Sequence, residues 1–256
     1  VLGACLVNDI VDVISHSAFE VNNGVFTGSA TFNEGSADAD FRVESNGNAN
    51  MLFVDGGNNA VVIGHNDATN GTFASSQALQ VVGTSFTTSS LGLTRFSADA
   101  NGPSISLSKS RAAGIGTDTV VQDDDSLGEI LFTGADGTDM ATQGASISAA
   151  IDGTPGGNDL PTRLTFSTTS DGNSSPTERM RIDSSGHLLV GKTVANNTDV
   201  GTSIYSTLGF SSTRSGGVVG ILNRTTNDGD ILMFRKDSTT VGKIGNDGSN
   251  MFIGKQ

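Results

Sequence analysis

Short runs of alternating apolar and polar residues, separated by turn-forming residues, recur along this chain of 256 residues. The clearest example spans residues 177–193, where an alternating run ends at Ile182, Asp-Ser-Ser-Gly follows, and an apolar run begins at Leu188. Period-two alternation around such a turn is typical of a β-hairpin. The same order recurs at residues 53–64 and 234–245, with turns of different length. Repetition of one small β unit is therefore the main structural prediction.

Further β-strands are predicted wherever the same alternation returns between turn signals. They are expected at residues 24–32, 41–44, 51–54, 61–63, 79–83, 92–96, 104–111, 128–132, 144–151 and 162–167. Asn46 and Gly47 lie between two of these runs and predict a tight hairpin turn. Residues 6–14 fit a short helix and a strand almost equally well, because their apolar spacing is helical while many of their side chains are β-branched.

The C-terminal part of the chain follows the order of the middle part with shorter loops. Residues 220–224, 229–234 and 242–245 correspond to residues 105–111, 128–132 and 144–147, and the second run has one residue more. We therefore expect two versions of one β-module. The predicted regions are an N-terminal connector or shaft segment (1–35), a first hairpin shaft region (36–100), a large module (101–195) and a shorter second module (196–256).

No single hairpin of this kind is expected to be stable alone, because each strand offers only two to four apolar side chains. Burying one such side chain contributes roughly 1.5–3 kcal/mol, whereas ordering the backbone costs about 1–2 kcal/mol per residue. The strands must stack as a solenoid or be shared among identical chains. Irregular repeats and long polar loops favour the second arrangement. The predicted fold is all-β: an elongated, intertwined homotrimeric β-fibre of prism-like or β-helix-like modules, with a short N-terminal helix as an option.

Composition and charge narrow the functional classes. The chain is 35% hydrophobic and lacks Trp, a bias also typical of disorder, but its apolar residues lie in alternating runs and it has only four Pro. The net charge of −13 argues against nucleic acid and anionic membranes as partners. Cys5 has no second cysteine with which to form an intrachain disulfide. We expect neither membrane insertion nor a signal peptide, since no apolar run approaches about 18 residues and no charged n-region precedes one.

Two acidic groups are candidates for chemistry. Asp123, Asp124 and Asp125, followed by Glu129, could bind Ca²⁺ or Mg²⁺, which prefer carboxylate ligands, but the residue order of a calcium-binding loop is absent. A solvated acidic loop is the preferred interpretation. Asp228 and Asp230 could form the carboxylate pair of a glycoside hydrolase. Such spacing is common in turns, and there is no Trp to line a sugar subsite, so an enzyme is not predicted.

The remaining polar residues give no site by their spacing. His16, His65 and His187 lack metal-ligand spacing, although a three-fold axis could bring copies of one of them together. The Gly-rich stretches at 114–116 and 216–217 lack a following helix and so do not predict a phosphate site. Four arginines are expected to pair with acidic residues across strands or chains: Arg179, Arg181, Arg224 and Arg235. No catalytic, cofactor-binding or metal-binding residue is predicted, and no cofactor.

The hairpin sequence at 177–191, TERMRIDSSG followed by LLVG, resembles the ERMRIDSSG-x-VGIGT motif of tail-fibre and appendage proteins of tailed bacteriophages, especially marine and cyanobacterial ones. Residues 223–231, 234–237 and 41–55 resemble other segments of those proteins, so that the resemblance spans most of the chain from Phe26 to Gly254. The chain departs from the motif at 187–189, where the family often has Asn-Val-Gly, and the strand character is kept.

The resemblance implies a trimeric virion component that helps to engage the host surface. The predicted function is that of a structural, non-enzymatic tail fibre, located on the virion and acting outside the cell after synthesis in the host cytoplasm. Its expected partners are its own copies, other tail or baseplate proteins and a host receptor, with glycan as the default class. Polar loops at 118–126 and 152–161 are expected to project and carry recognition. The alternatives are a tailspike-like polysaccharide depolymerase and another virion-decorating adhesin.

Overall fold

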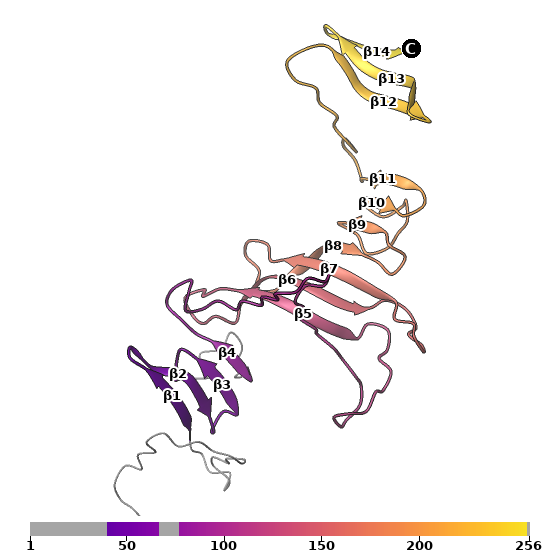
Figure 1. The fold of residues 1–256 in the computed structure, drawn as a ribbon. Helices are drawn as coiled ribbons and strands as arrows, with labels where there is room; N and C mark the ends of the chain where they lie inside the picture. Colours follow the sequence, from indigo (N-terminus) through magenta and orange to yellow (C-terminus); the bar gives the residue numbers. More distant parts are fainter. Residues whose placement is uncertain (1–39, 67–76, 255–256) are drawn as a thin grey trace, which may run out of the picture. The chain divides into compact units, whose positions relative to one another are not determined.

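The computed structural model describes residues 40–66 and 77–254, which form fourteen strands in three sheets and no helix (Figure 1). The all-β prediction is confirmed for these residues. The chain divides into two compact units: the first, which ends at Leu91, holds a four-stranded sheet, and the second, from Gly92 onward, holds the other two sheets. The predicted strand at 24–32 and the helix or strand at 6–14 lie outside the described residues.

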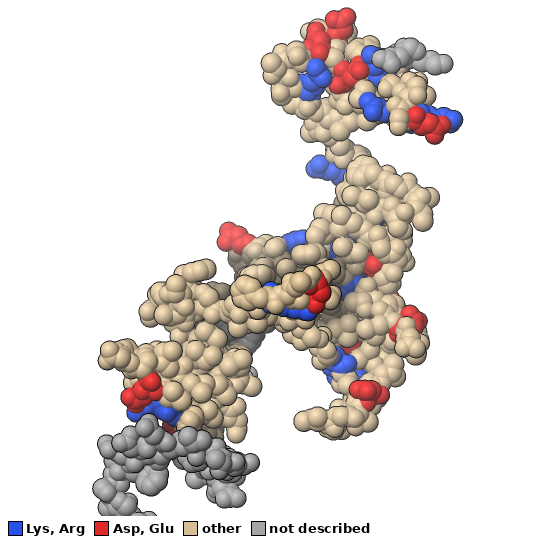
Figure 2. Space-filling view, viewed as in Figure 1, with Lys and Arg blue, Asp and Glu red and all other residues tan. Residues whose placement is uncertain are grey.

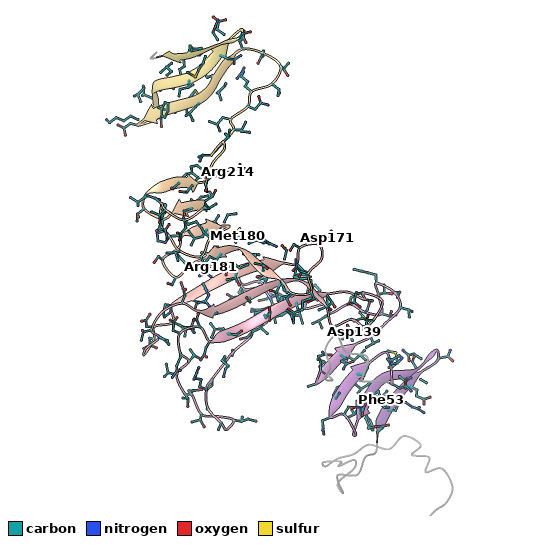
Figure 3. The ribbon with its side chains drawn as sticks, turned by 180° about the vertical axis from the view of Figure 1, so that it is seen from behind. Phe53, Asp139, Asp171, Met180, Arg181 and Arg214 are labelled. Atoms are coloured by element: carbon teal, nitrogen blue, oxygen red, sulfur yellow. The ribbon has the colours of Figure 1, made fainter. Side chains whose placement is uncertain are left out.

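The four-stranded sheet has the order β1-β2-β3-β4, with a parallel pair between β3 and β4. Its strands are β1 (Phe41–Ser45), β2 (Asn48–Asp55), β3 (Ala60–Ile63) and β4 (Leu79–Val81). The tight turn predicted at Asn46 and Gly47 joins β1 to β2. Asp55 holds the next turn, because its carboxylate accepts hydrogen bonds from the backbone and side-chain amides of Asn58, both at 2.9 Å. The core of this sheet consists of Phe53 (labelled in Figure 3), Ala60 and Val62.

The seven-stranded sheet has the order β11-β10-β9-β8-β7-β6-β5, and each strand pairs antiparallel with the next one in the chain. Its strands are β5 (Ser126–Thr133), β6 (Gln143–Ile151), β7 (Thr162–Thr168), β8 (Thr177–Ile182), β9 (Leu188–Val190), β10 (Gly201–Tyr205) and β11 (Gly209–Thr213). The main predicted hairpin is confirmed as β8–β9. Gly186 in its turn has a φ of 77°, a left-handed conformation that glycine adopts without strain.

The three-stranded sheet has the order β12-β13-β14, all antiparallel. Its strands are β12 (Gly229–Lys236), β13 (Thr239–Asp247) and β14 (Asn250–Gly254). Asp237 and Ser238 form the β12–β13 turn and both have positive φ, 49° and 65°. Two consecutive left-handed residues match the right-handed twist of the flanking strands. The third predicted hairpin is therefore confirmed, with a turn shorter than the sequence indicated.

Three predicted strands are wrong. Residues 92–96, 104–111 and 220–224 belong to no sheet. Among the described residues, neither 92–110 nor 214–228 takes part in a backbone–backbone hydrogen bond. Alternation of apolar and polar residues is therefore not sufficient to form a strand, because a strand also needs a neighbouring backbone with which to pair. Conversely, the alternation does not predict β10, β11 and β14, since the first two consist mostly of Gly, Ser and Thr and the third is a short apolar run.

The two modules align with a shift of one residue from the alignment predicted by sequence. Phe132 lies opposite Ala145 in the first module, and Phe234 lies opposite Gly242 in the second. Gly242 therefore corresponds to Ala145 and not to the glycine before it. The additional residue of the second module is accommodated as a β-bulge at Ile231. The sequence thus predicts the extra residue correctly but not its effect on the register.

Candidate functional site

One face of the seven-stranded sheet is mostly apolar across all seven strands and is partly exposed, although Ile151 at its edge is buried. Residues directly opposite one another on paired strands point to the same side of a sheet, so the pairing defines its rows. The first row is Gly128, Ala149, Leu164, Ile182, Leu188, Ile204 and Phe210; the second is Ile130, Ile147, Phe166, Met180, Val190, Thr202 and Ser212. Neither row contains a charged residue. The exposed large side chains among them range from 37% exposed at Leu164 to 72% at Phe210.

The opposite face is mostly polar and is covered by the chain itself around Leu189 and Ser203. Its central row is Glu129, Ser148, Thr165, Arg181, Leu189, Ser203 and Ser211. Leu189 and Ser203 are 0% exposed. The β9–β10 loop bonds to this face, where Arg181 donates to the Thr193 carbonyl at 3.3 Å and the Tyr205 hydroxyl donates to Asn197 at 2.9 Å. The β9–β10 loop therefore covers the polar face around Leu189 and Ser203, whereas large side chains on the apolar face are up to 72% exposed.

The four-stranded sheet has the same two-sided construction. The row Arg42, Phe53, Val62 and Gln80 belongs to the face that holds the core, where Val62 is 0% exposed. The row on the other face is Phe41, Val54, Val61 and Leu79, and it is uncharged and partly exposed. One face of this sheet thus holds buried core residues, and the other face is partly exposed.

The three-stranded sheet repeats the pattern. On one face Asp230 forms an ion pair with Lys243 at 3.1 Å, and the Lys243 ammonium lies 5.7 Å from the centre of the Phe252 ring. The other face carries the row Leu232, Ile244 and Ile253, with Met251 beside it. Ile253 is 74% exposed and Met251 is 72% exposed. Figure 2 shows the charged side chains in small separate groups with uncharged surface between them.

Charged residues of the β8–β9 hairpin make contacts within β8 and within the turn. The Arg181 guanidinium binds Glu178 through two hydrogen bonds of 2.6 and 2.7 Å, and these bonds raise the pKa of Arg181. Asp183 accepts hydrogen bonds from the backbone of Ser185 and His187 in the turn, at 3.0 and 2.9 Å. The His187 ring lies edge-on to Tyr205 with centroids 5.2 Å apart. Figure 3 labels Met180 and Arg181 on β8, and these neighbours belong to opposite faces of the sheet.

Two of the four arginines predicted to form ion pairs bind uncharged groups instead. Arg179 donates to Thr168 at 3.2 Å and Arg224 donates to Asn227 at 2.8 Å, so neither makes the predicted ion pair within the described residues. His16 lies outside the described residues, and His65 and His187 belong to different units. No group of three His, Cys, Asp or Glu side chains is placed to hold a metal in the part of the chain that the structure describes.

The acidic triplet joins loops that are distant in sequence. Asp123 accepts a hydrogen bond from the Gly153 backbone at 2.8 Å, and Asp124 binds Arg163 at 2.7 Å. Asp125 accepts two hydrogen bonds from Arg111, at 2.6 and 2.7 Å. This pairing lowers the pKa of Asp125 well below its ordinary value and raises that of Arg111. A freely solvated acidic loop is therefore a wrong description of Asp125, whose side chain is 14% exposed.

Asp228 and Asp230, the candidate hydrolase pair, are both engaged in structural contacts. Asp228 accepts hydrogen bonds from the Asn246 side-chain amide at 2.7 Å and from the Gly248 backbone at 2.8 Å. Asp230 is the partner of Lys243 in the ion pair of the three-stranded sheet. Each carboxylate thus has local partners that explain its presence at the β12 end of this sheet.

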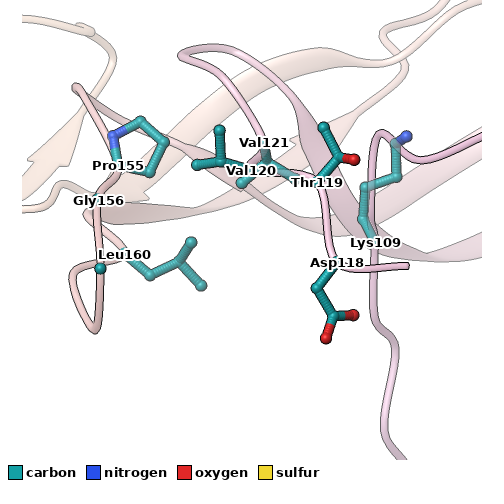
Figure 4. Close-up of a pocket in the computed structure, with 9 residues that line it drawn as sticks. Lys109, Asp118, Thr119, Val120, Val121, Pro155, Gly156 and Leu160 are labelled. Carbon is teal, nitrogen blue, oxygen red and sulfur yellow. The ribbon is translucent and has the colours of Figure 1, made fainter. Parts of the chain in front are cut away.

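A groove of about 520 Å³ lies between the two loops that the sequence predicts to carry recognition (Figure 4). Val120 and Leu160 line it and are 58% and 56% exposed, while Val121 is 6% exposed. Lys109 and Asp118 are the charged residues that line it. Because Asp123 and Asp124 tie one loop to Gly153 and Arg163, the groove is pre-formed, which lowers the entropic cost of binding a ligand.

No protein-family model and no curated protein matches this chain. In the part of the chain that the structure describes, no helix is long and apolar enough to cross a membrane.

Proposed function

We propose that this protein is a non-enzymatic structural fibre of a bacteriophage tail, that it assembles as a homotrimer, and that it contributes to attachment at the host surface. The observation that carries this proposal is the uncharged apolar face exposed on each of the three sheets. A soluble protein that works as a single chain rarely leaves such continuous faces open, and they mark association surfaces. A fibre shaft needs such a surface along its length, because its strands are too poor in apolar residues to be stable alone.

The energy available from these faces is of the same order as the cost of association. Seven large side chains in the β5–β11 strands are exposed on the apolar face: Ile130 54%, Phe132 52%, Leu164 37%, Ile182 42%, Val190 43%, Ile204 50% and Phe210 72%. Full burial of one such side chain contributes roughly 1.5–3 kcal/mol, so covering the exposed half of seven gives about 5–10 kcal/mol per chain. Association costs about 4–15 kcal/mol. Burial of the apolar faces of the other two sheets adds to the favourable energy of association.

Identical chains are the partner that best fits these faces. The rows carry no charge, although the chain has a net charge of −13, so they lack the charged groups by which a foreign partner is usually selected. Rows of similar composition on identical chains can meet around a symmetry axis with no unpaired charge buried. The resemblance of the β8–β9 hairpin to phage fibre motifs supports three copies and a place on the virion.

Host recognition is assigned to the groove between residues 118–121 and 155–160. Its loops are joined by hydrogen bonds, and it is partly apolar, as binding sites on scaffolds commonly are. The alternative of a polysaccharide depolymerase draws no support from Asp228 and Asp230, since both carboxylates already have structural partners. The proposal therefore remains a binding fibre.

Light scattering of the purified chain tests the assembly. The expected mass is three times the 26.1 kDa of one chain. Ile182→Asp places a charge on the apolar face and is expected to convert the trimer to smaller species, whereas Thr207→Asp, in the exposed β10–β11 turn, should leave it intact. A wild-type mass of one chain would refute the fibre. The trimer should also block adsorption of the phage that carries it, and Leu160→Asp, in the groove, should abolish that block without changing the mass.

A further inference from the structure

In both modules an extended arm precedes the first strand of the sheet and is tied to that strand by an arginine. Arg111 in the first arm binds Asp125 at 2.6 Å, one residue before β5. Arg224 in the second arm donates to the Asn227 carbonyl at 3.0 Å and to the Asp230 carbonyl in β12 at 3.3 Å. The equivalence of the two arginines aligns the arms residue by residue. Ser108 in the first arm therefore corresponds to Ile221 in the second.

Each arm turns one side toward its own sheet. Alternate residues of an extended segment point to opposite sides, so residues two apart share a side. In the first arm Leu107 packs over Gly128, where an added Cβ would lie 2.6 Å from the Leu107 Cβ atom. In the second arm Gly220 and Leu222 line a hollow of about 520 Å³, together with Leu232, Ile244 and Met251 of the apolar face.

The outer sides of the two arms differ in chemistry. The first arm presents Ser106 and Ser108, whose hydroxyl oxygens are 3.2 Å apart and which suit a solvated surface. The second presents Val219 and Ile221, which are 54% and 81% exposed. A segment that is apolar on both sides is typical of a strand covered on both sides. The second arm is therefore apolar on both sides, and Leu222, on the side that faces its own sheet, is itself 64% exposed.

We propose that the outer side of the second arm, Val219 and Ile221, is buried against the apolar face of the three-stranded sheet of a second copy of this chain. That face offers Ile253, 74% exposed, and Met251, 72% exposed. Neither Val219 and Ile221 of the arm nor the row Leu232, Ile244 and Ile253 of the face carries a charge. Each face then receives Leu222 from its own chain and Ile221 from its neighbour. Such a head-to-tail contact closes into a ring when the rotation fits. The inference rests on the proposed trimer and names the segment that joins its chains.

Hydrogen exchange of the full-length trimer tests this contact. Ile221→Asp is expected to speed exchange throughout β12, β13 and β14 by at least about tenfold, the effect of losing about 1.4 kcal/mol of protection, while leaving β5–β11 unchanged. Ser108→Asp introduces the same charge at the matching position of the first arm and should change nothing. Unchanged exchange in Ile221→Asp would overturn the inference.

Cross-linking between chains provides a second measurement that does not depend on destabilisation. In a Cys5→Ser background, a tagged chain with Ile221→Cys is refolded together with an untagged chain with Ile253→Cys, and a short bis-maleimide is added. The expected product joins tagged to untagged chains. Intact mixed trimers that give no such product would refute the arm contact and leave the trimer standing. A wild-type chain that is monomeric in solution would defeat both proposals.

Discussion

Replacing Leu189 with alanine tests whether the polar face of the seven-stranded sheet is the closed one. Leu189 is 0% exposed and lies in the row between Arg181 and Ser203. The substitution removes three carbon atoms, which costs about 2.4 kcal/mol for loss of burial at about 0.8 kcal/mol each. The neighbours belong to hydrogen-bonded strands and cannot collapse fully into the gap, so a cavity term adds to this cost. The expected loss of unfolding free energy is about 2.7–5 kcal/mol per chain.

Leu208→Ala is the matched control, because Leu208 lies in the β10–β11 turn and is 78% exposed. Only about a fifth of its surface is covered, so the same chemical deletion should cost about 0.5 kcal/mol. Both variants and the parent are unfolded in urea at one protein concentration, and the free energies are compared at equal m-value. If Leu189→Ala falls within about 1 kcal/mol of Leu208→Ala, the closed face has been assigned to the wrong side of the sheet.

Three further outcomes follow from named contacts. Arg163→Met breaks the bond to Asp124 and the 3.4 Å contact to Asp152. It should lower the free energy of unfolding in urea by about 1.5–3 kcal/mol. Arg235→Met, at an exposed position, is the control and should leave that free energy unchanged. The Thr142 hydroxyl and backbone amides lower the pKa of Asp136 to about 2. The ionised Asp136 carboxylate therefore contributes its full stabilisation of the folded chain above the ordinary Asp pKa near 4, and this contribution is lost as the pH falls toward 2. In thermal melts across this pH range, the melting temperature of Asp136→Asn should fall less steeply with falling pH than that of the parent chain. An equally steep fall would contradict the role given to Asp136. Gly245→Ala would place a Cβ 2.3 Å from the Gly229 carbonyl oxygen and should destabilise the three-stranded sheet by about 1–3 kcal/mol in urea, whereas Gly134→Ala, with open space around it, should not.

The sequence predicts those parts of the fold whose causes are local. The β8–β9 and β12–β13 hairpins are predictable because the alternation of apolar and polar residues and the turn-forming residues lie within a few positions of one another. The segment 104–111 was misassigned, because strand formation depends on a backbone partner that alternation does not reveal. Strands β10 and β11 were missed for the opposite reason: their few apolar residues give no pattern, and their place is fixed by pairing with β9.

The candidate site was only partly predictable for similar reasons. The two loops that line the groove were expected from their polarity and length. The role of the acidic triplet was not, because Asp124 and Asp125 meet Arg163 and Arg111, which lie 39 and 14 residues away in the sequence. An acidic run looks the same in sequence whether it faces water or binds distant arginines. Only the three-dimensional arrangement distinguishes the two.

The exposed apolar faces also have a consequence for the newly made chain. In the proposed trimer assembly, each chain displays uncharged sheet surface of the kind that drives off-pathway aggregation until it meets its copies. Folding and oligomerisation are then coupled kinetically, and the yield of native protein depends on how quickly the right copies meet. The net charge of −13 opposes random collisions between chains, while the faces themselves stay uncharged and free to associate. Negative charge on the loops and other faces thus protects the unassembled chain without weakening the assembled one.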